Sequence, residues 1–146
     1  MAGDSGDRVR RDGREPLKDY SVDKLSQEVI ASIIRVHKAL GPGFLENICH
    51  RALAVDLKNS EIPFKTEYEI DICYNSELVG RHRLDLVVRD SLIVELKAVE
   101  KLTKAHYSQL RSYLKAAGLK TGLLVTFFKD KADFRRVGLE AHAPKY

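Results

Sequence analysis

Residues 81–97, with the sequence RHRLDLVVRDSLIVELK, decide the fold of this chain. Apolar residues occupy every second position on both sides of the turn signal at residues 89–91, which predicts two antiparallel strands. The alternation puts six aliphatic residues on one face: Leu84, Leu86, Val88, Leu92, Val94 and Leu96. A three-residue turn that pairs Val88 with Leu92 keeps this face intact and sets Asp85 opposite Glu95, whereas a two-residue turn would break it.

Two carboxylates in directly paired positions repel each other, so a positive group is expected beside Asp85 and Glu95. Lys97 lies two residues further along the same face, and a hard divalent cation such as Mg²⁺ would bind both carboxylates. The alternative is a structural network in which Lys97 or Arg83 neutralises the acids. The hairpin alone leaves both interpretations open.

Helical and strand patterns extend outward from this hairpin. Apolar residues at steps of three and four predict helices at residues 22–40 and 44–58, separated by Gly41-Pro42-Gly43. Alternation predicts strands at residues 64–74, 78–88 and 92–97. A helix is expected at residues 103–117, with Thr103 as its N-cap and Gly118 as its stop, followed by an apolar strand at 121–128.

These patterns predict an α/β fold in which helices flank a mixed four-stranded sheet. Three strands form an antiparallel meander, and the strand–helix–strand segment 92–128 adds one parallel strand by a right-handed crossover. The basic end of the chain has room for a short edge strand around residues 134–139. Residues 1–19, with glycines and alternating charge, predict a disordered tail before a single domain at residues 20–146.

Composition narrows the class of protein. The chain has 146 residues, of which 44% are hydrophobic and 32% charged, a globular balance. No apolar run reaches the roughly 20 residues that span a bilayer, and the charged N-terminus differs from a signal peptide, so a cytoplasmic protein without membrane contact is expected. Cys49 and Cys73 provide no disulfide framework.

The net charge of +4 lies in the predicted domain, because residues 1–19 carry five basic and five acidic groups. A basic folded body is compatible with a polyanionic partner such as nucleic acid.

The pair formed by Asp85 and the Glu95-Leu96-Lys97 tripeptide resembles the motif of the PD-(D/E)XK nuclease superfamily. Further segments make the chain similar to the GxxExxY protein family over about residues 22–128: His37, residues 40–43 (LGPG), residues 44–46 (FLE), RHRLDLVV, LIVELKAVEKL and GLKTGLLVTF. The resemblance implies a restriction-endonuclease-like core. One position departs from the signature, because Cys49 stands where the family name expects tyrosine; its place on the apolar side of the helix favours a packing role.

The resemblance implies a metal-dependent nuclease, most simply one that acts on DNA. Asp85, Glu95, the Leu96 carbonyl and Glu46 would hold Mg²⁺, which Mn²⁺ could replace, and Lys97 would orient the attacking water or stabilise developing negative charge. Gln109 and Tyr113 are four residues apart on one helix and resemble the Q-x-x-x-Y motif of the RecB-like branch.

Other roles stay open for these residues. Glu46 also suits a helix N-terminus electrostatically, and Gln109 and Tyr113 also suit an ordinary half-buried helix face. His37 is a further candidate beside its commoner role as a packed histidine. The alternative function is a module that keeps the nuclease fold but binds nucleic acid or protein without useful turnover. A homodimer or a protein partner is compatible with either function.

Overall fold

The computed structural model describes residues 22–139 of the chain. The tail predicted at residues 1–19 lies outside the described residues. Within them, every predicted helix and strand is present, and its ends lie within two residues of the prediction. The elements are α1 (Val22–Leu40), α2 (Glu46–Asn59), β2 (Phe64–Tyr74), β3 (Glu77–Val88), β4 (Leu92–Leu96), α3 (Lys104–Ala117), β5 (Thr121–Thr126) and β6 (Asp133–Gly138).

The described strands form one mixed sheet in the order β2-β3-β4-β5-β6. The antiparallel meander β2-β3-β4 and the parallel pair of β4 with β5 confirm the predicted topology. The predicted strand count of four is wrong, because β6 pairs antiparallel with β5 from Thr126↔Asp133 to Thr121↔Gly138. The apolar strand β5 needs a partner on both edges, and β6 provides one while it exposes Arg135 and Arg136 to solvent.

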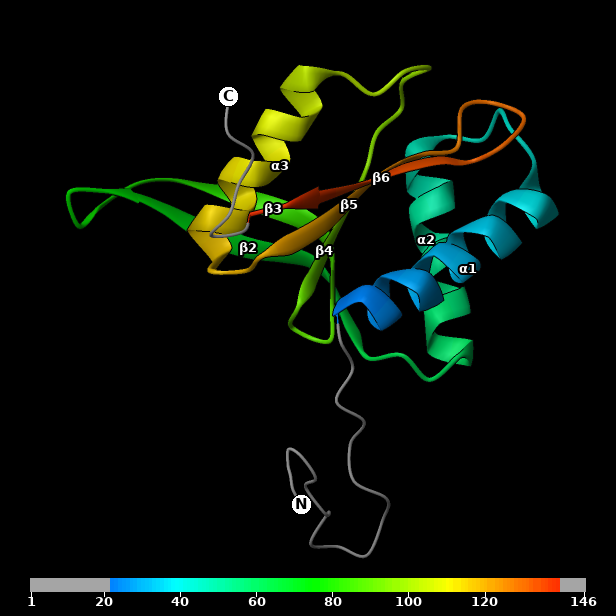
Figure 1. Cartoon of the computed structure of the whole chain (residues 1–146), viewed down its shortest axis with the longest axis horizontal. Coiled ribbons are helices and arrows are strands. Elements are labelled where there is room, and N and C mark those ends of the chain that lie inside the picture. The colour runs from blue at the N-terminus through cyan, green and yellow to red at the C-terminus, as the bar shows by residue number, and fades with distance from the viewer. Residues whose placement is uncertain (1–21, 140–146) are drawn as a thin grey trace, which may run out of the picture.

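The sheet separates two apolar cores. Helices α1 and α2 cover one face, and α3 covers the other (Figure 1). Leu86, Val94 and Leu123 belong to the core beneath α1 and α2. Val87 and Ile93 belong to the core beneath α3. The central strands are therefore buried on both sides, as is common where a parallel pair is involved. In the described part of the chain, no helix is long and apolar enough to cross a membrane.

The face of the sheet changes along β2 and β3 at one position. Thr66 pairs with Leu86 and Tyr68 pairs with Leu84, but no bridge joins the intervening Glu67 and Asp85. Glu67 has a left-handed backbone, with φ +51°, which is uncommon outside glycine. Beyond this position Leu84 packs in the core beneath α3, whereas Leu86 packs beneath α1 and α2. The prediction that Leu84 shares a face with Leu86 is therefore wrong.

Helix α3 has defined ends and packs closely on β5. The Thr103 hydroxyl accepts a hydrogen bond from the His106 N–H, and the His106 ring accepts one from the Thr103 N–H, so the predicted N-cap is confirmed. Gly118 ends the helix with φ +73°, a conformation that glycine adopts without strain. Leu110 of α3 lies directly over Gly122 of β5, which fixes how closely the helix approaches the sheet.

A Gly122→Ala substitution is expected to destabilise the protein by about 1–3 kcal/mol, because overpacking displaces buried side chains. The added Cβ would lie 2.8 Å from Leu110 Cδ2. Gly80→Ala is the matched control, since its Cβ would meet nothing within 4 Å. Urea unfolding measures both. Equal midpoints for the two variants would contradict this packing.

Candidate active site

Asp85 and Glu95 stand at the point where the ladder between β3 and β4 gives way to side-chain contacts. The register Leu86↔Val94, Val87↔Ile93 and Val88↔Leu92 confirms the three-residue turn. At the next position the Asp85 N–H donates to Glu95 Oε2 at 2.9 Å. The Leu96 N–H in turn donates to Asp85 Oδ2 at 2.8 Å. Each carboxylate therefore holds the backbone of the opposite strand.

Glu95 is an acid in an apolar sheet, with only 4% of its surface exposed. Burial and the neighbouring Asp85 charge raise its pKa to about 7, although the Asp85 N–H and the Lys97 charge oppose the rise. Near neutral pH the pair therefore resists carrying two negative charges. A cation at this position would relieve that repulsion.

Lys97 and Gln109 are brought together from different elements. The Lys97 Nζ donates to Gln109 Oε1 at 2.6 Å, which links the end of β4 to α3. The Lys97 backbone N–H also donates to the Val125 carbonyl at 2.8 Å. The lysine is thus fixed at both its backbone and its side chain beside the acidic pair.

Tyr113 lies against a histidine that the sequence did not single out. Its ring stacks on His82 of β3, with centroids 3.8 Å apart and planes 16° from parallel. Burial, with a contribution from Glu95 and Asp85, raises the pKa of Tyr113, so its phenol stays neutral near these carboxylates. Burial, and then the Lys97 charge, lowers the pKa of His82. A single histidine in a strand carries no periodic signal that could have found it.

Glu46 occupies the first turn of α2, where the charges of Asp85 and Lys97 act on its carboxylate. Its pKa is raised by partial burial and by repulsion from Asp85, while Lys97 and His50 lower it. Residues 22–139 contain no group of three or more His, Cys, Asp or Glu side chains close enough to hold a metal ion together. The structure therefore places Glu46 near the acidic pair without forming a three-carboxylate cluster.

His50 is a second site residue that sequence reasoning missed. Its Nε2 lies 2.9 Å from the Asp85 carbonyl oxygen, to which a protonated nitrogen donates. That carbonyl lies at the position where β2 and β3 are not bridged, so the histidine replaces a missing strand contact. His50 follows Glu46 by four residues, and this spacing on one helix face was the available signal. Together with Glu67 and Arg83 these residues line a pocket of about 400 Å³.

Two other sequence candidates have packing positions. His37 is 5% exposed, and its Nε2 lies 3.1 Å from the Phe127 oxygen and 2.7 Å from the Lys129 oxygen, which makes it a packed histidine. Cys49 is 2% exposed within the core beneath α1 and α2, as expected for a packing role. Burial, with repulsion from Glu46, raises the pKa of the Cys49 thiol, which keeps it neutral.

Comparison with protein-family models identifies the family of this chain. A family model described as the PD-(D/E)XK nuclease superfamily matches residues 23–137. The chain belongs to this superfamily. A search of curated proteins found no match.

Two solved structures have a fold similar to that of this chain. The first is that of SSO0001, with a TM-score of 0.53 and 23% identity over 81% of this chain and 60% of that one. The second is an alkaline exonuclease from Laribacter hongkongensis, with a TM-score of 0.50 and 12% identity over 82% of this chain and 71% of that one. The chain thus spans less than two thirds of the first structure, and at these identities both show the fold alone.

PD-(D/E)XK nucleases use divalent metal ions, and the donors in this chain fit such an ion. Asp85 and Glu95 each use one oxygen to accept a backbone N–H, which leaves each a second oxygen. Mg²⁺ is commonly bound by only one or two carboxylates and keeps several waters. Burial and then repulsion from Asp85 raise the pKa of Glu95, and an ion bound by both carboxylates would stabilise the charged form against both effects.

Stability of the metal-free protein is expected to fall as the pH rises from about 4.5 to 7. The pKa of Glu95 is higher in the folded protein than its ordinary 4.5, so folding binds a proton across this window. Glu95→Gln cannot titrate, and its unfolding free energy relative to the wild type is expected to rise by roughly 2–3 kcal/mol over the window. Urea unfolding in EDTA at several pH values measures this.

Glu69→Gln, on the outer strand β2, is the control for that series because its side chain is exposed. If the free energy of unfolding changes with pH in the same way for the wild type and Glu95→Gln, Glu95 does not titrate in this range.

Proposed function

We propose that this chain is a Mg²⁺-dependent nuclease that hydrolyses phosphodiester bonds in DNA, with Mn²⁺ as a substitute ion. The observation that carries the proposal is the reciprocal contact of Asp85 and Glu95, in which each carboxylate accepts an N–H from the opposite strand. This arrangement presents two acids at a fixed separation beside Lys97. Membership of the nuclease superfamily supports the same chemistry.

Asp85, Glu95 and the Leu96 carbonyl would hold the ion. When bound, Mg²⁺ supplies polarisation of the scissile phosphate and lowers the pKa of water. The buried Glu95 and the backbone bonds preorganise the two carboxylates, so little rearrangement is needed when a phosphate enters.

Lys97 would act on the reacting phosphate. Its ammonium group can hold the attacking water or stabilise negative charge in the transition state. Gln109 accepts one hydrogen bond from Nζ at 2.6 Å, which sets the direction of the remaining two donors. Tyr113, whose ring is held by His82, would position the substrate on the α3 side of the site.

Glu46 would act through water rather than as one of three clustered ligands. It lines the pocket beside Asp85 together with His50, which follows it by four residues on α2. Gly43 and Glu46 also support assignment to the GxxExxY family, the finer classification that we propose within the superfamily.

Purified protein is expected to cut labelled DNA in the presence of Mg²⁺ or Mn²⁺. Cleavage should not occur in EDTA, which removes the ion. Asp85→Asn should abolish cleavage, because it removes a charge from the pair that binds the ion. Lys97→Met should lower the rate by roughly 10²- to 10³-fold, the usual loss when one preorganised electrostatic group is removed. Gel analysis of single-turnover reactions measures both effects.

Matched controls come from the same sheet. Asp71→Asn and Lys65→Met each change an exposed ion pair, formed with Arg81 and Asp90 respectively, and should cut at the wild-type rate. Cleavage that persists in folded Asp85→Asn protein would place the chemistry elsewhere.

A second candidate function is a module that binds nucleic acid without turnover. Cys49 at the signature tyrosine position motivates it, since a thiol replaces neither the phenol's hydrogen bond nor its ring. The burial of Cys49 in the core beneath α1 and α2 favours the active protein, because the side chain at this position contributes to packing. Metal-independent binding with no cleavage would support the module.

Lys97→Ala is expected to change the free energy of unfolding by less than about 1 kcal/mol, because the partly buried side chain contacts a neutral amide. A purely structural ion network would instead lose about 3–5 kcal/mol when one partner is removed. Urea unfolding decides between them. Arg35→Ala, which removes the Arg35 contacts with Asp56 and Ser60 between α1 and α2, is the comparison that should destabilise.

The remaining proposals rest on the sequence. DNA is the proposed nucleic-acid partner, a homodimer or a protein partner is compatible with the site, and the cytoplasm is the proposed location. Size-exclusion chromatography with light scattering tests the dimer directly.

A further inference from the structure

Two large aromatic side chains are exposed beside the candidate active site. Phe44, in the connection between α1 and α2, is 50% exposed, and Phe128, just after β5, is 56% exposed. Both line a narrow cleft that Glu46 and Lys97 also line. We call Phe44 and Phe128 the aromatic surface. Because both rings line one cleft next to Glu46 and Lys97, they form an apolar patch of the kind that marks an interaction site.

Phe128 is held outward by its neighbours. The Phe128 N–H donates to Thr126 Oγ1 at 3.2 Å, and the Thr126 hydroxyl donates to the Val99 carbonyl at 2.6 Å. On its other side, the buried Phe127 ring stacks on His37, whose Nε2 lies within hydrogen-bond distance of two carbonyls in this segment. The exposed ring is therefore presented by a supported backbone.

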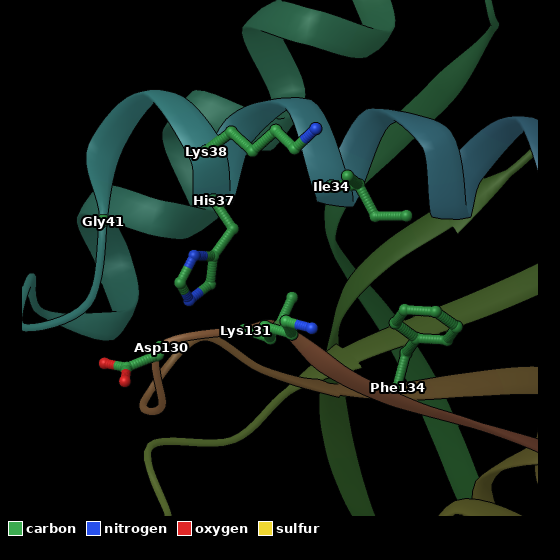
Figure 2. Close-up of a pocket in the computed structure, with 8 residues that line it drawn as sticks. Ile34, His37, Lys38, Gly41, Asp130, Lys131 and Phe134 are labelled. Atoms are coloured by element: carbon green, nitrogen blue, oxygen red, sulfur yellow. The ribbon is translucent and has the colours of Figure 1, made fainter.

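A row of pockets leads away from the acidic pair across the aromatic surface. Glu46 lines both the pocket at Asp85 and the narrow cleft, and Phe128 lines both that cleft and the next pocket. Asp130 and Lys131 then join this pocket to a larger one of about 510 Å³. Figure 2 shows that larger pocket between α1 and the segment leading into β6, with the His37 ring directed from α1 toward the segment.

Lysines accompany the row. Lys129 and Lys131 line the pocket next to Phe128, and Lys38 and Lys131 line the larger one. Acidic groups are present too, at Glu100 and Asp130, so charge alone would bind a polyanion weakly. The aromatic rings are thus the main source of binding energy that the surface offers.

We propose that the aromatic surface stacks unpaired bases and that the substrate of the nuclease is single-stranded DNA. This inference rests on the proposed function. Bases of an intact duplex are already stacked on each other and cannot cover a phenylalanine ring beside the strand, whereas the bases of a single strand can. Stacking on aromatic side chains next to basic groups is the usual way in which proteins bind single strands without sequence preference.

A protein partner is the less suitable occupant. A partner that covered Phe44 and Phe128 would also close the cleft that contains Glu46 and Lys97, and so would block the groups proposed to act on phosphate. A single strand covers the same rings while its backbone delivers a phosphate to them.

Binding of fluorescent oligothymidylate of about 10 nucleotides, within the usual range for single-strand sites, tests the surface. Anisotropy in EDTA is measured for the wild type, Phe128→Ala, Phe128→Trp and Tyr74→Ala. Phe128→Ala is expected to weaken binding by about 5- to 150-fold, the loss of one stacked base. Phe128→Trp should restore it. Tyr74→Ala, at a tyrosine that is 69% exposed and outside these pockets, should bind like the wild type.

Unchanged affinity in folded Phe128→Ala protein would overturn the inference, and so would equal weakening in Tyr74→Ala. Cleavage of single-stranded and duplex DNA of the same sequence in Mg²⁺ gives the second readout. Preference for the single strand, lost in Phe128→Ala, supports the inference. Efficient cutting of blunt duplex with no such preference overturns it while the proposed nuclease stands. Phe128-dependent binding without any cleavage overturns the proposed nuclease while the single-strand surface stands.

Discussion

The repulsion between the Asp85 and Glu95 carboxylates is the constraint around which the site is arranged. Two acids on neighbouring strands of a buried sheet are tolerated because each accepts a backbone N–H from the other strand. Those bonds replace the main-chain ladder at this position. Burial and the repulsion that remains raise the pKa of Glu95 to about 7, and a cation would relieve that repulsion. Folding thus stores an unfavourable interaction at the point where the proposed chemistry needs a positive ion.

The opening on the other edge of β3 follows from the same position. Glu67 and Asp85 are not bridged, and the strands change face there, so Leu84 turns toward α3 while Leu86 stays beneath α1 and α2. The change of face frees the Asp85 carbonyl, which His50 of α2 then contacts. The irregularity therefore lies at the pocket that the proposed substrate would enter beside Asp85.

Sequence pattern predicted the parts of this arrangement that depend on periodicity. The register of β3 and β4 could be derived because a one-residue slip would have turned every apolar side chain to the wrong face. The face change at Leu84 could not, because it depends on a left-handed backbone at Glu67, a residue type that gives no such signal. The role of His82 could not be predicted either, because its ring stacks on Tyr113 of α3, an element distant in sequence, and periodicity carries no information about such a contact. The strand β6 corresponds to the short edge strand for which the sequence left room around residues 134–139, but two adjacent exposed arginines interrupt its alternation, so the predicted sheet of four strands omitted it.

The parallel pairing of β4 and β5 explains why chemistry and the proposed substrate contacts meet at one edge. Leu96 pairs with Val125, so the chain leaves both strands at the same end of the sheet, the end at which ligands commonly bind in parallel sheets. Lys97 follows immediately on one strand, and Phe128 follows three residues after Val125 on the other. The Lys97 N–H to Val125 carbonyl bond and the Thr126 hydroxyl bond to Val99 tie the two exits together. Any shift of β5 against β4 would therefore move the aromatic surface and the lysine relative to each other, so the proposed base stacking and the proposed phosphate positioning depend on one geometry.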